Sequence, residues 1–323
     1  MRLALAVSIL LLARAAAART GAPADYTQPG PLPVGVTTIE ITTTSVTTGA
    51  PRVLATQVWY PAVAGTGTPA GALLRDADVA KGRHLLVVFS HGSCGLPNQS
   101  PFLMEALASR GMILAAPPHP GNTTRDDCDA PGALADAYAN RPADVAAVTD
   151  RFLALSKDKT SRFHRHVNPK RLGVAGHSFG GQTTLRVAAG DKRFKVGLAL
   201  APAVAPGITI AVPLMVMTGE LDSLTPFAED AEPSYALATG PRWLVKILRT
   251  GHCAFIPVCL EQFCGAGCEP GTLAPAEANA LVLRYAVPFM LRYLEGDRKA
   301  AKALRPDAAP AGLVVETATG RKR

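Results

Sequence analysis

Short runs of apolar residues that alternate with helix-like segments constrain most strongly how this chain folds. The runs contain few polar residues, as strands buried on both faces do: Leu85–Phe89, Met112–Ala116, Leu172–Ala175, Val196–Leu200, Leu214–Met217 and Trp243–Leu248. Helical spacing is present in Phe102–Arg110, Pro142–Leu155 and Ala276–Leu294, and Pro142 suits the first turn of its helix. This alternation predicts an α/β fold whose central sheet is mostly parallel and has helices on both faces.

The N-terminal part of the chain has a different pattern. Val36–Thr47 and Val53–Tyr60 are rich in β-branched residues, and Thr48–Pro51 supplies turn residues between them. We therefore expect an antiparallel strand pair ahead of the parallel sheet. The expected organisation is a signal peptide over residues 1–18, an extended lead-in over 19–34, one α/β domain over 35–300 and a peripheral tail over 301–323.

The first residues read as an export signal. Met1-Arg2 is a short positive region, Leu3–Ala13 is apolar, and Ala15–Ala18 offers the small residues of a cleavage site after Ala18. A buried core helix is the alternative interpretation. The apolar run is shorter than the ~20 residues that cross a bilayer. The sequence therefore predicts a secreted or periplasmic protein without a stable membrane anchor.

The charge pattern bears on the class of partner. The chain has 33 Lys and Arg against 25 Asp and Glu, and five of the bases lie at Arg2, Arg14 and residues 321–323. Nucleic-acid binding requires a concentrated basic face, and the sequence contains no such cluster. We expect a small-molecule ester or lipid-like substrate and no nucleic-acid partner; the oligomeric state is left open.

The cysteines fit an oxidising compartment. They are even in number, and the last four lie close together: Cys94, Cys128, Cys253, Cys259, Cys264 and Cys268. Disulfides are the favoured interpretation, although the sequence selects none of the 15 possible pairings. A zinc site is the alternative, since Cys264 and Cys268 have the spacing of metal ligands.

Gly176-His177-Ser178-Phe179-Gly180 is the most specific motif in the chain. It follows a predicted buried strand and opens a helix, which is the setting of a Gly-x-Ser-x-Gly nucleophile elbow. The turn is so tight that side chains two residues before and after the serine would collide, which explains the glycines. Ser178 is therefore the candidate nucleophile.

A serine nucleophile needs a base and an acid that orients the base. In this class of site the chain order is serine, acid, histidine. His252 is the single histidine after Ser178, and it follows a predicted strand. Asp222, beyond Gly219 at the end of another strand, is the preferred acid, and Glu220 is its competitor.

The loop Ser90-His91-Gly92-Ser93 follows an earlier buried strand, where such sites take part of their oxyanion hole. We expect the backbone amides of Ser93 and Phe179 to bind the anion. His91 is interpreted as a residue that shapes this loop through local hydrogen bonds. The chemistry needs no metal and no cofactor.

Apolar residues near these positions predict a substrate cleft, with Phe179, Phe255 and Ile256 as its substrate-binding residues. Residues 253–268 are expected to form a disulfide-held rim beside His252. The alternative is a cystine-stapled segment far from the substrate.

Four segments together resemble the α/β-hydrolase superfamily, and most of all its platelet-activating-factor acetylhydrolase and dienelactone-hydrolase-like branch: Val87–Gly92, Ala115–Thr123, Arg141–Asp144 and Gly173–Gly181. The likeness runs from about Val53 to Leu294. It implies an α/β-hydrolase fold and hydrolysis of carboxylic esters through Ser178, His252 and Asp222, with short-chain acyl esters as the expected substrates.

Two departures from that branch matter. Dienelactone hydrolases use a cysteine nucleophile, whereas this elbow carries Ser178. The animal acetylhydrolases take their acid from the strand after the nucleophile helix, which here ends Ala201-Pro202. The later Asp222 resembles cutinase-like polyester hydrolases instead. Polyester hydrolysis is therefore an alternative function, as is peptidase or amidase activity on the same fold. A non-catalytic binding protein is the least favoured alternative.

Overall fold

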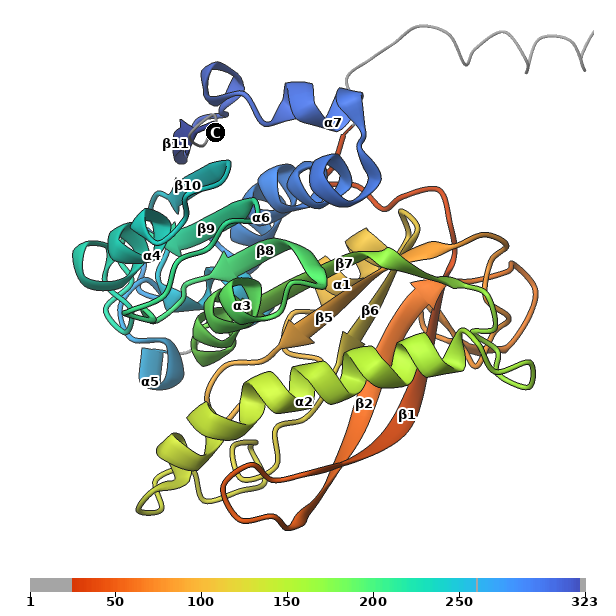
Figure 1. Ribbon diagram of the computed structural model, residues 1–323. Helices are drawn as coiled ribbons and strands as arrows, with labels where there is room; N and C mark the ends of the chain where they lie inside the picture. The colour runs from red at the N-terminus through yellow and green to blue at the C-terminus, as the bar shows by residue number, and fades with distance from the viewer. Residues whose placement is uncertain (1–24, 260, 320–323) are drawn as a thin grey trace, which may run out of the picture.

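The computed structural model describes residues 25–259 and 261–319, which build one eleven-stranded sheet flanked by helices (Figure 1). The strand order is β11-β10-β9-β8-β7-β5-β6-β2-β1-β4-β3. The predicted signal peptide, its cleavage after Ala18 and the first part of the lead-in lie outside the described residues. Within them, no helix combines the length and the apolar character that crossing a bilayer requires.

Six neighbouring strands at the centre of the sheet are parallel, as the apolar runs predict. They are β6 (Met112–Ala116), β5 (His84–Ser90), β7 (Val167–His177), β8 (Phe194–Leu200), β9 (Leu214–Gly219) and β10 (Arg242–Ile247). Their apolar side chains are buried on both faces because helices cover both. The expected fold class is thereby confirmed.

Antiparallel strands flank this centre. The predicted pair is present as β1 (Val34–Thr44) and β2 (Pro51–Pro61), and β2 continues the sheet antiparallel to β6. Two short strands complete this edge: β4 (Leu73–Arg75), which pairs parallel with β1, and β3 (Thr68–Ala70), which pairs antiparallel with β4. At the opposite edge, β11 (Leu313–Ala318) pairs antiparallel with β10. The expectation of a peripheral tail from residue 301 is therefore wrong, because this segment supplies an edge strand of the sheet.

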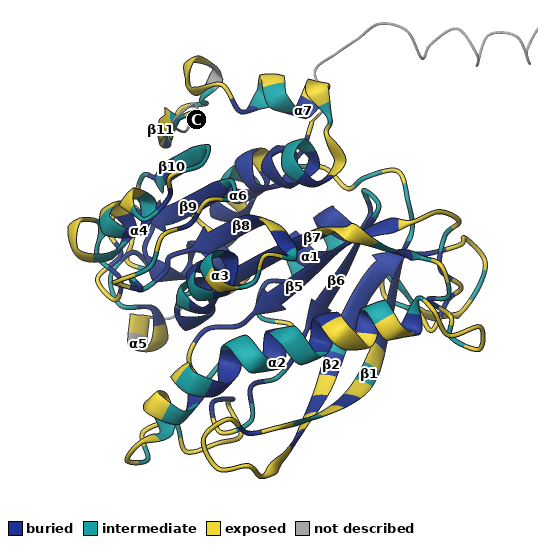
Figure 2. Cartoon of the chain, viewed as in Figure 1, coloured by how far each residue is buried: buried dark blue, intermediate teal, exposed yellow. Residues whose placement is uncertain are grey.

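The four main helices are divided between the two faces of the sheet (Figures 1 and 2). Helices α1 (Pro101–Ala108) and α6 (Pro275–Met290) pack on one core, and α2 (Ala133–Leu155) and α3 (Phe179–Gly190) pack on the other. Successive residues of β5 point to opposite faces of the sheet. Val87 and Phe89 belong to the core under α1 and α6, whereas Leu86 and Val88 belong to the core under α2 and α3. Short helices occupy the remaining connections: η2 (Phe227–Ala231), α4 (Glu232–Ala236), η3 (His252–Phe255), α5 (Glu261–Cys264), η4 (Leu291–Glu295), α7 (Arg298–Ala303) and η5 (Pro306–Ala308).

Helix α2 begins at Ala133, so the prediction that Pro142 opens it is wrong; Pro142 lies inside the helix. A proline has no N–H to donate to the carbonyl four residues earlier. That carbonyl belongs to Tyr138, and the Arg186 guanidinium donates to it from α3 while lying 3.6 Å from the centroid of the Tyr138 ring. A contact with another helix thus supplies the donor that Pro142 lacks, and the extra N-terminal turns of α2 reach the candidate site.

Candidate active site

Ser178 lies in the sharp turn between β7 and α3, with a φ of 57° and a ψ of −121°. The flanking glycines are required by close backbone approaches. A Cβ atom at Gly176 would lie 2.2 Å from the Gly180 carbonyl oxygen, and one at Gly180 would lie 1.9 Å from the Ser90 carbonyl oxygen. The steric reason inferred from the motif is therefore observed. A non-glycine residue in this left-handed region is strained, as is common at functional sites.

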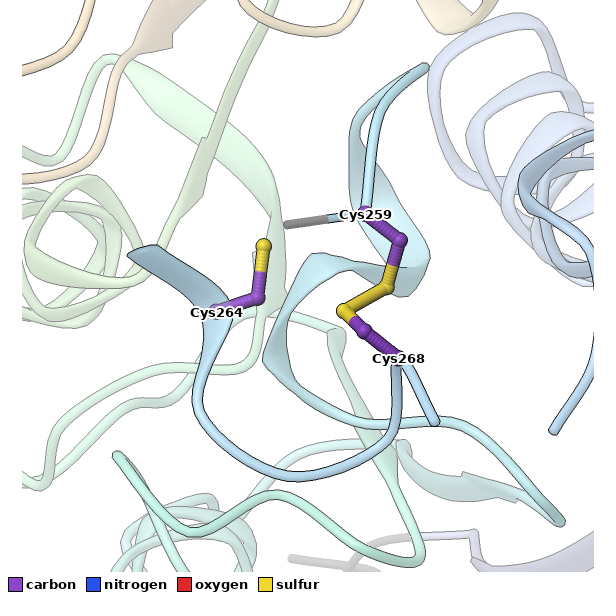
Figure 3. Close-up of side chains that lie close together, drawn as sticks. All are labelled: Cys259, Cys264 and Cys268. Atoms are coloured by element: carbon purple, nitrogen blue, oxygen red, sulfur yellow. A yellow bond between two sulfur atoms is a disulfide. The ribbon is translucent and has the colours of Figure 1, made fainter. Parts of the chain in front are cut away.

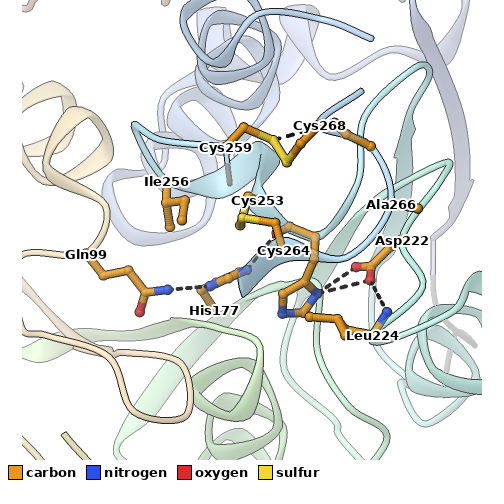
Figure 4. The surroundings of a disulfide bond; sticks show 12 residues. Gln99, His177, Asp222, Leu224, Cys253, Ile256, Cys259, Cys264, Ala266 and Cys268 are labelled. Carbon is orange, nitrogen blue, oxygen red and sulfur yellow. Dashed lines mark hydrogen bonds and ion pairs between the residues drawn. A yellow bond between two sulfur atoms is a disulfide. The ribbon is translucent and has the colours of Figure 1, made fainter. Parts of the chain in front are cut away.

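His252 and Asp222 form a buried hydrogen-bonded pair. His252 Nδ1 donates to Asp222 Oδ2 at 2.9 Å and lies 3.1 Å from Oδ1 (Figure 4). Asp222 follows β9 and His252 opens η3 after β10, so the ends of two neighbouring strands bring them together. Glu220, the competing acid, accepts instead from the Arg249 backbone N–H at 2.9 Å.

The Asp222 carboxylate is held by its own loop. The backbone N–H groups of Leu224 and Thr225 donate to Oδ1 at 3.0 and 2.9 Å, and the Thr225 hydroxyl donates to Oδ2 at 2.9 Å. Burial opposes ionisation of Asp222, but the hydrogen bond and charge of His252 and the Thr225 bonds together leave its pKa below the ordinary value. Sequence reasoning missed Thr225. An Asp followed three residues later by Thr at a strand end is an available signal for this turn.

His177 connects the elbow to the His252 loop. Gln99 Nε2 donates to His177 Nδ1 at 2.7 Å, and His177 Nε2 donates to the His252 carbonyl at 2.9 Å (Figure 4). Burial, followed by the proximity of His252, lowers the pKa of His177 to about 3, so this ring is neutral. The rings of His177 and His252 lie 4.7 Å apart between centroids. The residue next to Ser178 therefore contacts the His252 loop directly.

The pairing of His252 leaves one ring nitrogen free. Over residues 25–259 and 261–319, every hydrogen bond of the His252 ring uses Nδ1. A neutral imidazole whose Nδ1 donates has an unprotonated Nε2, which is able to accept a proton. This is the protonation state that a general base requires.

Ser178 opens into a surface pocket of about 900 Å³. Ser93, Phe179 and Thr225 also line it, and the start of α2 together with the segment before it forms a largely apolar wall that includes Leu134 and Tyr138. The other lining residues are Cys128, Asp129, Ala130, Pro131, Gly132, Ala135, Gln182, Ala203 and Leu224.

The two expected oxyanion residues flank Ser178 in this pocket. In the part of the chain that the structure describes, the backbone N–H groups of Ser93 and Phe179 donate to no protein acceptor. Phe179 is the first residue of α3, so its amide is also at the positive end of a helix dipole. Neither N–H is therefore engaged by another described residue of the protein.

The structure separates the three residues expected to bind substrate. Phe179 lines the pocket. Phe255 does not, and this prediction is wrong: its side chain is fully buried, packs against His177 at 5.6 Å between ring centroids, and belongs to the core under α6. Ile256 is half-buried and is not among the residues that line the pocket.

All six cysteines form disulfides: Cys94–Cys128, Cys253–Cys264 and Cys259–Cys268. The sulfur atoms of Cys259, Cys264 and Cys268 lie within 4.8 Å of one another (Figure 3), but each is bonded to another sulfur. Zinc binding needs thiolates, so the zinc alternative is wrong for this arrangement.

The disulfide-bonded segment packs against the loop that holds His252. A Cβ atom at Gly251 would lie 1.8 Å from the Ala266 carbonyl oxygen, and Cys253, next to His252, is bonded to Cys264. The Ala266 amide donates to the Ser223 hydroxyl beside Asp222 at 3.1 Å. Cys253, Cys264 and Ala266 are therefore close to the His252 loop, as expected, but no described residue of 253–259 or 261–268 lines the pocket.

Comparison with known proteins finds a family match over the part of the chain that contains these residues. A protein-family model described as PET hydrolase-like matches residues 101–257, which include Ser178, Asp222 and His252. The chain has the α/β-hydrolase fold. The family match and the parallel sheet with its elbow support that statement together.

Several curated relatives are similar at low identity. Cutinase est1 of Thermobifida alba is 29% identical over 46% of this chain and 46% of its own length. Cutinase 2 of Thermobifida cellulosilytica is 25% identical over 68% and 72%, and a bis(hydroxyethyl) terephthalate hydrolase of Streptomyces coelicolor is 22% identical over 79% and 71%. The chain thus spans about half the length of the first relative. These matches agree with the cutinase-like neighbours of the sequence resemblance rather than with its acetylhydrolase branch.

Proposed function

We propose that the protein is a serine hydrolase of carboxylic esters in which Ser178 is the nucleophile, His252 the base and Asp222 the orienting acid. One observation carries this proposal: the Asp222–His252 hydrogen bond of 2.9 Å at the sheet edge where the strained elbow presents Ser178. The contacts of His177 hold the two parts of the site together.

In the proposed mechanism, His252 Nε2 takes the Ser178 proton as the hydroxyl attacks the ester carbonyl. The amides of Ser93 and Phe179 stabilise the oxyanion, where one such donor is worth about 3 kcal/mol. The alcohol leaves with the proton from His252, and Asp222 stabilises the imidazolium in between. Water then attacks the acyl-enzyme by the same steps, releases the acid and restores Ser178.

Polyester or cutin-like esters are the proposed substrate class. Three apolar residues at the pocket, Leu134, Tyr138 and Leu224, are 56%, 40% and 52% exposed. An exposed apolar margin suits a chain that extends beyond the pocket. The names of the cutinase and terephthalate hydrolase relatives support the same class. The acetylhydrolase-like preference for short acyl chains is the second candidate, which the sequence resemblance favours.

The N-terminal pattern of Arg2, an apolar run and Ala15–Ala18 supports export as part of this proposal. Mass spectrometry of the protein secreted by an expression host tests it, because cleavage after Ala18 gives a defined N-terminus. An intact Met1 on the exported protein would contradict it.

A fluorophosphonate probe tests the nucleophile. We expect the wild-type chain to be labelled at Ser178 and Ser178→Ala to show neither labelling nor ester hydrolysis. Hydrolysis that survives this substitution would refute the assignment. A panel of p-nitrophenyl esters of graded acyl length, run beside a polyester film, separates the two substrate classes. Product release from the film supports the polyester class, whereas turnover confined to acetyl and butyryl esters supports the second candidate.

A further inference from the structure

A buried cation lies beneath the loop that holds Ser93. The Arg141 side chain is fully buried. One of its terminal nitrogens donates to the His91 carbonyl at 2.5 Å, and the other donates to the Gly92 carbonyl at 3.0 Å and to Asn122 Oδ1 at 2.5 Å. The ordinary interpretation of a buried arginine is an ion pair, but its hydrogen-bond partners here are two successive backbone carbonyls and an amide.

The two peptide groups of this loop are held differently. In the His91–Gly92 peptide, the carbonyl accepts from Arg141 and the N–H donates to Gln99 Oε1 at 2.7 Å, so both ends have partners. In the Gly92–Ser93 peptide, the carbonyl accepts from Arg141 at 3.0 Å, from His91 Nδ1 at 2.7 Å and from the Gly95 N–H at 3.2 Å. Its N–H, which belongs to Ser93, has no protein acceptor among the described residues.

Peptide planarity connects these two facts. The carbonyl and the N–H of a trans peptide point in opposite directions. Donors that hold the Gly92 carbonyl on the protein side therefore turn the Ser93 N–H away from them, and Ser93 lines the pocket. Positive charge at the carbonyl end also withdraws electron density from the peptide and strengthens its N–H as a donor.

We propose that Arg141 is a positioning residue for ester hydrolysis, which orients and polarises the Gly92–Ser93 peptide so that the Ser93 N–H stabilises the oxyanion. This inference rests on the proposed function. Arg141 remains cationic at neutral pH, because burial lowers its pKa only to about 9. Its guanidinium carbon also lies 4.4 Å from the centroid of the Phe179 ring, so Arg141 contacts this ring as well as the carbonyl end of the Gly92–Ser93 peptide.

The test compares Arg141→Lys with Arg52→Lys. Lysine keeps the charge but not the planar fork that bridges two carbonyls. Arg52 is a matched control: it is a buried arginine of the same polar network that donates to Asp144 and not to the oxyanion loop. We expect Arg141→Lys to lower kcat on a soluble p-nitrophenyl ester about 10- to 100-fold with KM changed less than about threefold. Arg52→Lys is expected to lower thermal stability without a comparable loss of kcat.

A boronic acid inhibitor provides a second readout, because its oxygen occupies the oxyanion hole in the serine adduct. Its affinity should weaken by the same factor as kcat in Arg141→Lys. Ser93→Pro removes the N–H itself, so adding Arg141→Lys to Ser93→Pro should cause little further loss. Additive losses in the double variant, or an unchanged boronate affinity in Arg141→Lys, would overturn the proposal.

Asn122→Ala is the second variant, to be used where Arg141→Lys does not fold. It removes one Arg141 acceptor and also the hydrogen bond from Asn122 Nδ2 to Ser93 Oγ at 3.2 Å. A three- to tenfold loss of kcat with a parallel loss of boronate affinity is expected, and wild-type values for both would count against the proposal. Failure of the proposed function itself is distinguishable, because it appears as hydrolysis by Ser178→Ala.

Discussion

The described residues contain two Asp–His pairs joined by a similar hydrogen bond from the ring Nδ1 to a carboxylate oxygen. His252 Nδ1 lies 2.9 Å from Asp222 Oδ2, and His119 Nδ1 lies 2.9 Å from Asp144 Oδ2. The second pair even has a serine, because Ser90 Oγ lies 2.7 Å from His119 Nε2. A search for Asp–His hydrogen bonds alone would accept both pairs.

Their surroundings differ. Ser90, His119 and Asp144 are at most 1% exposed, and the Arg52 guanidinium binds the Asp144 carboxylate with two hydrogen bonds. Burial, followed by the charges of Arg141 and Arg52, holds the pKa of His119 well below its ordinary value. Ser178, by contrast, lines an open pocket.

The pKa values of the two carboxyl groups are displaced in opposite directions. Burial raises the pKa of Asp144 despite its bonds to Arg52, whereas His252 and Thr225 outweigh burial and lower the pKa of Asp222. A catalytic triad therefore also needs a serine hydroxyl that a substrate can reach, as Ser178 is in its pocket. Hydrogen-bond geometry is not enough.

The largest expected effect is on kcat, and it differs between the Asp222–His252 pair and the Asp144–His119 pair. Asp222→Asn should lower kcat by about 10⁴-fold, because the amide no longer orients the required His252 tautomer. Asp144→Asn should lower kcat of the folded enzyme by less than tenfold. Both are measured with a soluble ester, with the active fraction counted by fluorophosphonate labelling. Equal losses in the two variants would mean that the buried set takes part in the reaction.

The second expected effect is on the free energy of unfolding, and it concerns the Asp144–His119 pair. Asp144→Ala leaves the buried Arg52 guanidinium without its carboxylate, and should reduce the free energy of unfolding by about 3–5 kcal/mol. Chemical denaturation monitored by tryptophan fluorescence measures this loss. In the double variant Arg52→Met/Asp144→Leu, part of the loss should be regained, because neither charge remains buried alone. A double variant less stable than Asp144→Ala would contradict this account.

The smallest effect concerns pH. The pKa of His177 is depressed to about 3, below its ordinary value of 6.5, because the ring is buried. As the pH falls, His177 therefore binds a proton in the unfolded chain but not in the folded chain. The free energy of unfolding decreases as the pH falls from about 6.5 towards 3.

His177→Gln should reduce the pH dependence of the free energy of unfolding by up to about 1.4 kcal/mol per pH unit between pH 6 and 4. Denaturation curves at several pH values measure the slope. Part of the pH dependence should remain in His177→Gln, because burial also holds the pKa values of His91 and His119 well below the ordinary value. An unchanged slope would show that His177 titrates normally.

Much of the site follows from local sequence. Tight turns impose steric limits on neighbours in the chain, so Gly176 and Gly180 marked the elbow around Ser178. Strands buried on both faces have few polar residues, so the parallel sheet was predictable from the apolar runs. Because one histidine follows Ser178, its partner could be chosen by elimination, and the structure pairs that residue with Asp222.

Tertiary contacts decided the rest. Pro142 favours a helix start, but Arg186 on α3 supplies the donor that lets α2 extend past it to Ala133. Phe255 is as apolar as Phe179, yet it lies in the core because α6 and His177 cover it. The apolar character of a side chain predicts that it avoids water. It does not predict whether the rest of the protein or a bound substrate covers it.

The two Asp–His pairs show the same division. From the sequence alone, Asp144 and His119 are polar residues like Asp222 and His252. Which pair lies close to the elbow that carries Ser178 depends on packing between strands and helices that are far apart in the chain. Sequence by itself determined the sheet, the elbow and the residue types of the site, because these depend on neighbours along the chain. The tertiary structure alone decided burial, protonation and access, because these depend on long-range contacts.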